Sequence, residues 1–355
     1  MVQRSGEEGK RVRWGFALDF AEQVPSVLHP EQMYKLNSKR WLAECSLKSA
    51  NDLIIDCQCR CSVHATNSGR WYYGSDCNEC SSAMDKEISR VSDIIQDRHP
   101  PFVLKLTQCL GSVGTSLVKT QEERENLIDY ISGVLRQSLP RITAENAHIH
   151  PTSLVISDFI KGETMALNFF VRRNGSPVFL GACHQLSTRG GEGGRQQTAL
   201  TWSDQTKLEE RYRDVLKRIG QVLHSEGYFG PAGADVMQPP GDPTQFVIDL
   251  NVRTATSLVL GLLKTHCKDR GFDASAIFEC LILRIPRDDL ERKFSEEFRE
   301  GRIILLGNTK LGKNEMWAYP VVLAGERNGE VQSLSERILK YEAGGSEDAE
   351  DVGGG

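Results

Sequence analysis

The stretch 227–260 constrains the fold of this chain most strongly, because two short apolar runs here flank a segment of turn residues. The runs are residues 234–237 and 246–250, and the connector 238–244 is rich in Pro, Gly and Asp. Apolar runs separated in this way are typical of adjacent antiparallel strands. We therefore expect a two-stranded hairpin.

The predicted hairpin carries oxygen donors at matching places. Asp235 lies on the first strand, and Asp249 and Asn251 lie two apart on the second, where they share one face. Carboxylate and amide oxygens are hard donors of the kind that Mg²⁺ binds together with phosphate and water. Arg253 continues this face, and its guanidinium can hold a phosphate oxygen. The pattern predicts a magnesium–polyphosphate site; the alternative is a hairpin with charges on its solvated face.

Length and composition exclude several classes of protein. The 355 residues suffice for a substantial core in two or three lobes. The formal net charge of −5 argues against nucleic-acid binding by bulk electrostatics. No apolar run reaches the roughly 18 residues of a membrane helix, and the N-terminus lacks the apolar core of a signal peptide. We expect a cytoplasmic protein with neither nucleic-acid nor membrane partners.

Two lysines precede the hairpin in the sequence. Lys39 lies at the predicted start of a helix that Asn37 or Ser38 would cap, and a strand is expected at 53–55. Lys105 lies within the apolar run 102–106, which predicts another strand. Lys39 taken alone is equally compatible with a solvated lysine at the start of a helix.

A glycine-rich turn follows the second lysine closely. Its small residues are Gly111, Ser112, Gly114 and Thr115. With little or no side chain in the way, backbone N–H groups of such a turn can close over phosphates. The turn is not a Walker loop, because no Gly-Lys-Ser/Thr string follows it.

Taken in order, these features resemble the ATP-grasp superfamily, in its carboxylate–amine or carboxylate–thiol ligase branch. The resemblance rests on the string N-S-K-x-x-L from Asn37, on PFVLK…GSVGTSLV and on D-x-N-x-R from Asp249, and it covers about residues 30–265. It implies an α+β fold with two α/β lobes and ATP between antiparallel sheets, plus a small C-terminal α/β extension. Members usually carry a further N-terminal α/β lobe; about 30 residues precede the entry helix here, so we expect that lobe to be incomplete.

The resemblance also implies roles for individual residues. Lys39 and Lys105 would reach the nucleotide phosphates, and Lys105 and Arg253 would act in catalysis by neutralising charge on the transferred group. Asp235, Asp249 and Asn251 would bind one or two Mg²⁺. The remaining nucleotide contacts would come from the glycine-rich turn (Gly111, Ser112, Gly114, Thr115), from the hinge backbone at Asp158, Phe159 and Ile160 against adenine, and from Glu163 on the ribose. From the residues alone, the segment 154–171 fits a plain β-hairpin better than a nucleotide hinge.

Two further segments are open to more than one interpretation. Cysteines with zinc-like spacing gather in one segment (Cys57, Cys59, Cys61, Cys77, Cys80), where structural Zn²⁺ and free thiols are the alternatives. The Gly- and Arg-rich run 188–199 suggests a mobile cover, in which Arg189 and Arg195 either meet an anionic substrate or are solvated.

The expected organisation has six parts. They are a short N-terminal segment (1–30), the entry helix with the Cys-rich insertion (31–100), a small lobe with the glycine-rich lid (101–162), a large lobe with the metal site (163–265), a C-terminal α/β extension (266–343) and a disordered acidic tail (344–355).

The expected activity is an ATP-dependent ligation. A carboxylate would be activated as an acylphosphate and joined to an amine, with release of ADP and phosphate. The alternatives are a kinase acting on a small-molecule hydroxyl and a non-catalytic ATP-binding regulator. The implied partners are ATP, Mg²⁺, and small carboxylate and amine substrates, with a homodimer possible.

Overall fold

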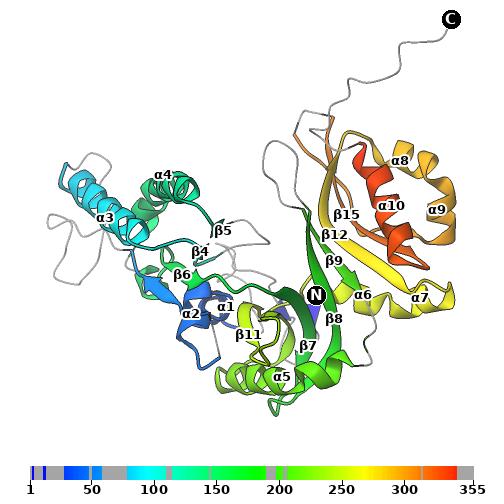
Figure 1. Cartoon of the computed structure of the whole chain (residues 1–355), viewed down its shortest axis with the longest axis horizontal. Helices are drawn as coiled ribbons and strands as arrows, with labels where there is room; N and C mark the ends of the chain where they lie inside the picture. Colours follow the sequence, from blue (N-terminus) through cyan, green and yellow to red (C-terminus); the bar gives the residue numbers. More distant parts are fainter. Residues whose placement is uncertain are drawn as a thin grey trace, which may run out of the picture. The chain divides into compact units, whose positions relative to one another are not determined.

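The computed structural model describes residues 2–3, 11–12, 28–47, 50–57, 78–108, 114–143, 145–188, 197–202, 205, 207–312 and 315–341 (Figure 1). The chain divides into two compact units. The first comprises Met1–Gly162, Val171–Ser176 and Lys217–Arg253, and the second comprises Glu163–Phe170, Pro177–Leu216 and Thr254–Gly355. The six-part division expected from the sequence stays a prediction.

A four-stranded antiparallel sheet forms the centre of the first unit's small lobe. Its order is β3 (Leu53–Ile55), β6 (Leu154–Asp158), β4 (Phe102–Leu106) and β5 (Thr115–Val118). Side chains alternate across each strand, so Phe102, Leu104 and Ile156 enter the core while Lys105 and its register partner Val155 lie on the opposite face.

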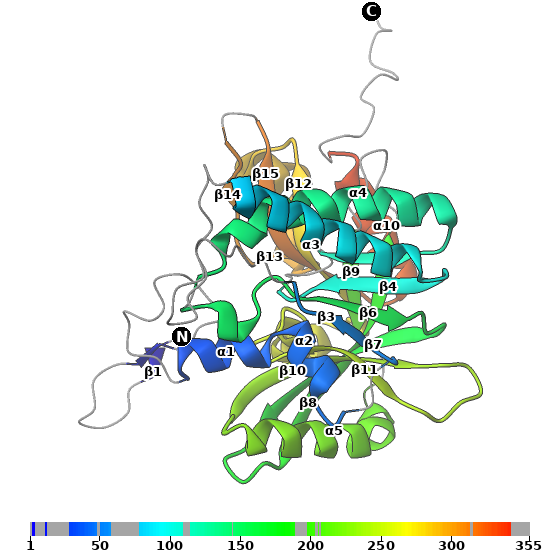
Figure 2. The same ribbon diagram turned by 90° about the vertical axis from the view of Figure 1, so that its left-hand side faces the viewer.

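Two long helices, α3 (Asn78–Gln96) and α4 (Gln121–Ser138), cover the apolar face of this sheet and lie side by side (Figure 2). Helix α3 buries residues three and four apart, from Met84 to Ile95, as its sequence pattern predicts. Helix α4 begins with a capping box, in which Thr120 and Glu123 satisfy each other's backbone N–H groups.

The first unit also contains the entry helices and the predicted hairpin. The entry helices are α1 (Pro30–Leu36) and α2 (Lys39–Glu44), and short 3₁₀ turns η2 (Leu139–Arg141) and η3 (Ala147–Ile149) precede β6. Strands β10 (Gly230–Gln238) and β11 (Phe246–Asn251) pair antiparallel, as expected. The strands β1 (Val2–Gln3) and β2 (Arg11–Val12) form a separate pair.

The second unit contains a larger antiparallel sheet. Its strands run in the order β7 (Glu163–Val171), β8 (Pro177–Thr188), β9 (Gln197–Trp202), β12 (Ala274–Leu283), β15 (Trp317–Gly325) and β13 (Ile303–Leu305), with β14 (Thr309–Lys310) also pairing with β15. The helices of this region are α6 (Leu258–Leu262), α7 (Lys264–Asp269), α8 (Arg287–Lys293), α9 (Ser295–Glu300) and α10 (Asn328–Leu339). Helix α10 packs on β12 and β15 through Val331, Leu334 and Ile338 (Figure 1).

The structure differs from the sequence-based expectation in four places. Strand β9 extends into a run predicted to be loop, and α10 was not predicted. The sequence pattern predicts one helix over 287–300, but the structure has two helices there, α8 and α9, because the backbone leaves the helical region at Phe294. The sequence pattern also predicts a helix over 203–224, and the observed helix α5 (Leu208–Ser225) starts later; its residues are divided between the second unit and the first. None of the helices in the described ranges combines the length and the apolar character needed to cross a bilayer.

Candidate active site

The corner between α1 and α2 places Lys39. Helix α1 ends at Leu36, and Asn37 is its C-cap. Ser38 is the N-cap of α2, and its hydroxyl accepts a hydrogen bond from the Trp41 N–H at 3.3 Å. Lys39 is therefore the first residue of α2, and its own N–H donates to the Thr107 carbonyl at 2.9 Å, which ties the corner to the end of β4.

Lys39 forms an ion pair with Asp249. Its Nζ donates to the Asp249 Oδ1, and the Lys39 side chain is 7% exposed while that of Asp249 is 23% exposed. The Leu250 N–H also donates to the same carboxylate oxygen, at 2.7 Å. Burial alone would raise the pKa of Asp249, but the ammonium groups of Lys39 and Lys105 outweigh it, so the pKa of this carboxyl is lowered.

Lys105 approaches β11 from the sheet of the small lobe. Its Nζ donates to the Ile248 carbonyl at 2.6 Å. Two lysines from separate elements therefore meet one strand, at Asp249 and at the residue before it. Two ammonium groups that lie so close together need negative charge nearby to offset their repulsion, and the carboxylate of Asp249 supplies part of it.

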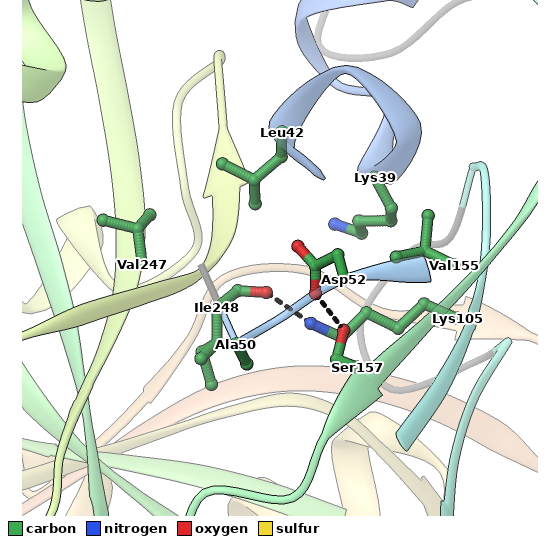
Figure 3. A pocket seen from close by; sticks show the side chains of 9 residues that line it. All are labelled: Lys39, Leu42, Ala50, Asp52, Lys105, Val155, Ser157, Val247 and Ile248. Carbon is green, nitrogen blue, oxygen red and sulfur yellow. Dashed lines mark hydrogen bonds between the residues drawn. The ribbon is translucent and has the colours of Figure 1, made fainter. Parts of the chain in front are cut away.

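A small cavity lies between these residues (Figure 3). Its volume is about 10 Å³, enough for roughly one water molecule. Residues from α2, β4, β6 and β11, and from the segment before β3, line it (Lys39, Leu42, Ala50, Asp52, Lys105, Val155, Ser157, Val247, Ile248). On its wall the Ser157 hydroxyl donates to Asp52 Oδ1 at 2.5 Å. Charged, hydroxyl and apolar groups thus surround one space in the first unit.

The donors predicted to bind metal lie together on β10 and β11. Asp235 is the register partner of Asp249, so the two side chains share a face of the hairpin, and a bulge follows Asp235 directly. Asn251 lies two residues further along that face, and its Oδ1 accepts from Arg253 Nη2 at 2.9 Å. Two carboxylates and one amide oxygen suit a hard divalent cation that takes further ligands from phosphate and water. The donor set therefore fits Mg²⁺.

The residue after Lys39 secures helix α2. Arg40 binds the Asp56 carboxylate through two hydrogen bonds, of 2.7 Å and 2.9 Å, and binds Glu44 at 2.7 Å. The Ser153 hydroxyl also donates to Asp56 at 2.6 Å. Bonding to Arg40 lowers the pKa of Asp56 to about 2.

The predicted phosphate-covering turn is described in part. Gly111 and Ser112 lie outside the described residues. Gly114 has φ +85, a conformation that favours glycine, and its carbonyl accepts from the Leu106 N–H at 2.8 Å. Thr115 is the register partner of Lys105. The start of β5 thus lies beside the predicted phosphate-binding lysine.

The predicted adenine hinge follows β6. The Asp158 carboxylate accepts hydrogen bonds from Arg98 and Asn51, and the Asp158 N–H donates to the Ala50 carbonyl at 2.8 Å. Phe159 is 37% exposed and Ile160 is half-buried. A Cβ on Gly162 would lie 2.6 Å from the Gln238 carbonyl oxygen, so this loop needs glycine where it passes the end of β10. Glu163 is the exposed first residue of β7, in the second unit.

The described cysteines do not support the zinc interpretation. Cys57 packs in the apolar core of the small lobe as a free thiol, and Cys80 is also fully enclosed. Burial raises the pKa of Cys57 to about 12, whereas zinc binds the thiolate. No group of three metal-ligating His, Cys, Asp or Glu side chains is found among the described residues. Cys59, Cys61, Cys77, Arg189 and Arg195 lie outside them.

Sequence reasoning missed Asp52 and Ser157 as neighbours of the site. Ser157 lies two residues from Val155 and so shares its face of β6, and this spacing was available from the sequence. Asp52 lies just before β3, and its pairing with Ser157 depends on the β3–β6 register, which the sequence does not reveal.

Comparison with known proteins identifies the fold. A family model described as "ATP-grasp domain" matches residues 98–221, a stretch that includes Lys105 and the hinge. The chain is similar to an L-amino acid ligase from Bacillus licheniformis, with a TM-score of 0.50 and 14% identity over 90% of this chain and 76% of that one. It is also similar to an N5-carboxyaminoimidazole synthetase from Staphylococcus aureus complexed with ADP, with a TM-score of 0.50 and 11% identity over 90% and 75% of the two chains. No curated protein matches it. These findings confirm the predicted fold class.

Proposed function

We propose that this chain, which belongs to the ATP-grasp superfamily, is an ADP-forming ligase that joins a carboxylate to an amine. One observation carries the proposal: two lysines from different elements contact neighbouring residues of β11. Lys39 binds the Asp249 carboxylate, which is predicted to hold Mg²⁺, and Lys105 binds the Ile248 carbonyl next to it. This arrangement suits the binding of a polyphosphate with its divalent cation. The L-amino acid ligase and the synthetase with the same fold support the choice of reaction class.

The proposed reaction has two steps. A carboxylate oxygen of the first substrate attacks the γ-phosphorus of ATP, the bond from that phosphorus to the β–γ bridging oxygen breaks, and ADP leaves. The amine nitrogen of the second substrate then attacks the acyl carbon of the acylphosphate, inorganic phosphate leaves, and the nitrogen loses a proton. The products are an amide, ADP and phosphate.

The charged side chains stabilise the transferred phosphoryl group. Lys39 and Lys105 hold phosphate oxygens, and Arg253 adds a planar guanidinium next to Asn251. Asp235, Asp249 and Asn251 would hold one or two Mg²⁺. When bound, the ion supplies positive charge that offsets the negative charge of the phosphate oxygens.

The remaining contacts would orient the nucleotide. The backbone at Asp158, Phe159 and Ile160 would meet the adenine edge, and Glu163 would bind the ribose hydroxyls. The turn containing Gly111, Ser112, Gly114 and Thr115 would cover the phosphates.

Calorimetric titration with ADP, with and without Mg²⁺, tests the nucleotide site. We expect the intact protein to bind ADP more tightly with Mg²⁺, and the variant Asp249→Ala/Asn251→Ala to lose this Mg²⁺-dependent gain. Asn146→Ala is a suitable control, because Asn146 bonds only backbone groups near η3 in the described structure. Failure of the intact protein to bind any nucleotide would contradict the proposal.

Product analysis tests the reaction class. ATP is incubated with mixtures of carboxylates and amines, and ADP release and amide formation are both measured. We expect ADP release to require a carboxylate, and amide formation to require the amine as well. ADP release with hydroxyl compounds and transfer of the phosphoryl group to them would instead identify a kinase.

A further inference from the structure

We propose that Asn37 is a positioning residue that fixes Lys39 against β11. The inference rests on the proposed function and deepens it, because it assigns a role outside the predicted set of nucleotide and metal ligands. It starts from one carboxamide that bonds two distant backbone segments.

Asn37 uses both ends of its side chain. Its Nδ2 donates to the Met33 carbonyl at 2.9 Å, in helix α1, and its Oδ1 accepts from the Val252 N–H at 2.9 Å, directly after β11. One partner is an acceptor and the other a donor, so a reversed amide would face like groups on both sides. The carboxamide therefore links the end of α1 to the end of β11 in a single orientation.

The segment that Asn37 holds is part of the proposed metal site. Val252 lies between Asn251 and Arg253, and Asp249 lies three residues before it. On the other side, Asn37 is two residues from Lys39. A single side chain thus connects the lysine-bearing corner to the strand that carries the carboxylate partner of that lysine.

Other bonds hold the corner at different places. The Lys39 N–H binds the Thr107 carbonyl, and Ser38 caps α2. The first contact ties the corner to β4 and the second fixes the start of α2, whereas Asn37 forms a hydrogen bond with the segment directly after β11. Because the strength of a charge contact depends steeply on distance and orientation, loss of this hydrogen bond would weaken phosphate binding through Lys39 without removing its charge.

A double-mutant cycle tests whether Asn37 acts through Lys39. We would measure the affinity for ADP with Mg²⁺ by calorimetry in the intact protein, Asn37→Ala, Lys39→Met and the double variant. We expect Asn37→Ala to weaken binding about tenfold, the typical effect of losing one hydrogen bond. In the Lys39→Met background the same change should have little further effect.

Asn146 provides the matched control. Its Nδ2 donates to the Arg141 carbonyl at 2.9 Å and its Oδ1 accepts from the Thr143 N–H at 2.7 Å, so it makes the same two kinds of bond between η2 and η3. Asn146→Ala should leave the affinity for ADP within about twofold. Hydrogen exchange gives a second readout that does not depend on nucleotide. The Val252 amide should exchange faster in Asn37→Ala than in the intact protein, and its exchange rate should be unchanged in Asn146→Ala.

The outcomes separate this inference from the proposed function. If the intact protein binds ADP and Asn37→Ala binds it equally well, the positioning role is wrong while the proposed function stands. An undiminished effect of Asn37→Ala in the Lys39→Met background would also overturn it, because Asn37 would then act independently of the lysine. If the intact protein binds no nucleotide, both proposals fail. If Asn37→Ala does not fold, Asn37→Ser, whose hydroxyl keeps a donor and an acceptor, replaces it in the cycle.

Discussion

Lys39 Nζ donates a hydrogen bond to Asp249 Oδ1, which joins residues 210 positions apart in the sequence. Both side chains are largely buried, so each charge depends on the other for compensation. The pair brings together the entry helix and the strand that carries the proposed metal ligands, two motifs that lie far apart in the sequence.

Removing one partner of this pair should lower stability. Lys39→Met leaves Asp249 buried without its main cation, and we expect the free energy of unfolding to fall by about 3 kcal/mol. Urea denaturation measures the loss. Lys35→Met is the control, because Lys35 pairs with Glu226 at 2.7 Å on a more exposed surface, where such a pair contributes about 0–1 kcal/mol. Equal losses in the two variants would contradict the buried character of the Lys39 pair.

Asp56 should make stability depend on pH in the acid range. Its bond to Arg40 lowers its pKa from 3.8 to about 2 in the folded protein, so the unfolded chain binds the proton more readily. The contribution of ionised Asp56 to the free energy of unfolding is therefore complete above about pH 4 and is lost as the pH falls towards 2.

We expect Asp56→Asn to lower the free energy of unfolding by about 2 kcal/mol at pH 7, an amount that corresponds to the shift in the pKa of Asp56. The difference from the intact protein should shrink between pH 4 and pH 2, as measured by urea denaturation at each pH. Asp85→Asn is the control, since Asp85 and Arg136 form an exposed pair. A difference that stays constant over this range would show that Asp56 acts through packing and not through its charge.

The sequence predicted those parts of the site that depend on local pattern. The apolar run of β4 that contains Lys105 and the D-x-N string of β11 are short-range signals, and each lies on the predicted element. Ser38 caps α2, one of the two caps considered. In each case the information is contained in a few neighbouring residues.

What the sequence could not show were relationships set by register and by helix ends. Asn37 was expected as an alternative cap, and it instead ends α1 and bonds Val252 across the fold. The bond between Ser157 and Asp52 follows from the β3–β6 pairing. Helix α10 buries Val331, Leu334 and Ile338 at helical spacing, directly before the Gly-rich, acidic end of the chain.

Buried and exposed cysteines should differ strongly in reactivity. Cys57 is 5% exposed and burial raises its pKa to about 12, whereas Cys280 is exposed. Because the thiolate is the reactive form, alkylation of Cys57 by iodoacetamide at pH 8 should be at least about a hundredfold slower than that of Cys280. Site-resolved mass spectrometry measures both rates, and denaturant should make them similar. Comparable rates in the folded protein would show that Cys57 is accessible.

Asp235 should be required for the Mg²⁺-dependent part of nucleotide binding. It is the register partner of Asp249 and would contribute a second carboxylate to the ion. Asp235→Asn keeps the shape of the side chain but removes its charge, so we expect ADP affinity without Mg²⁺ to be retained or slightly raised. The factor by which Mg²⁺ increases the affinity for ADP should fall at least about tenfold, which calorimetry at several Mg²⁺ concentrations would show.

Asp93→Asn provides the control for this change of charge, because Asp93 lies on the exposed side of α3 in the same unit. It should leave both affinities unaltered, since an exposed charge is screened by solvent and salt. If Asp235→Asn and Asp93→Asn behave alike, Asp235 is not a ligand, and the metal would have to be held by Asp249 and Asn251 with phosphate and water. If Asp235→Asn instead lowers affinity equally with and without Mg²⁺, the carboxylate supports the hairpin and does not bind the ion.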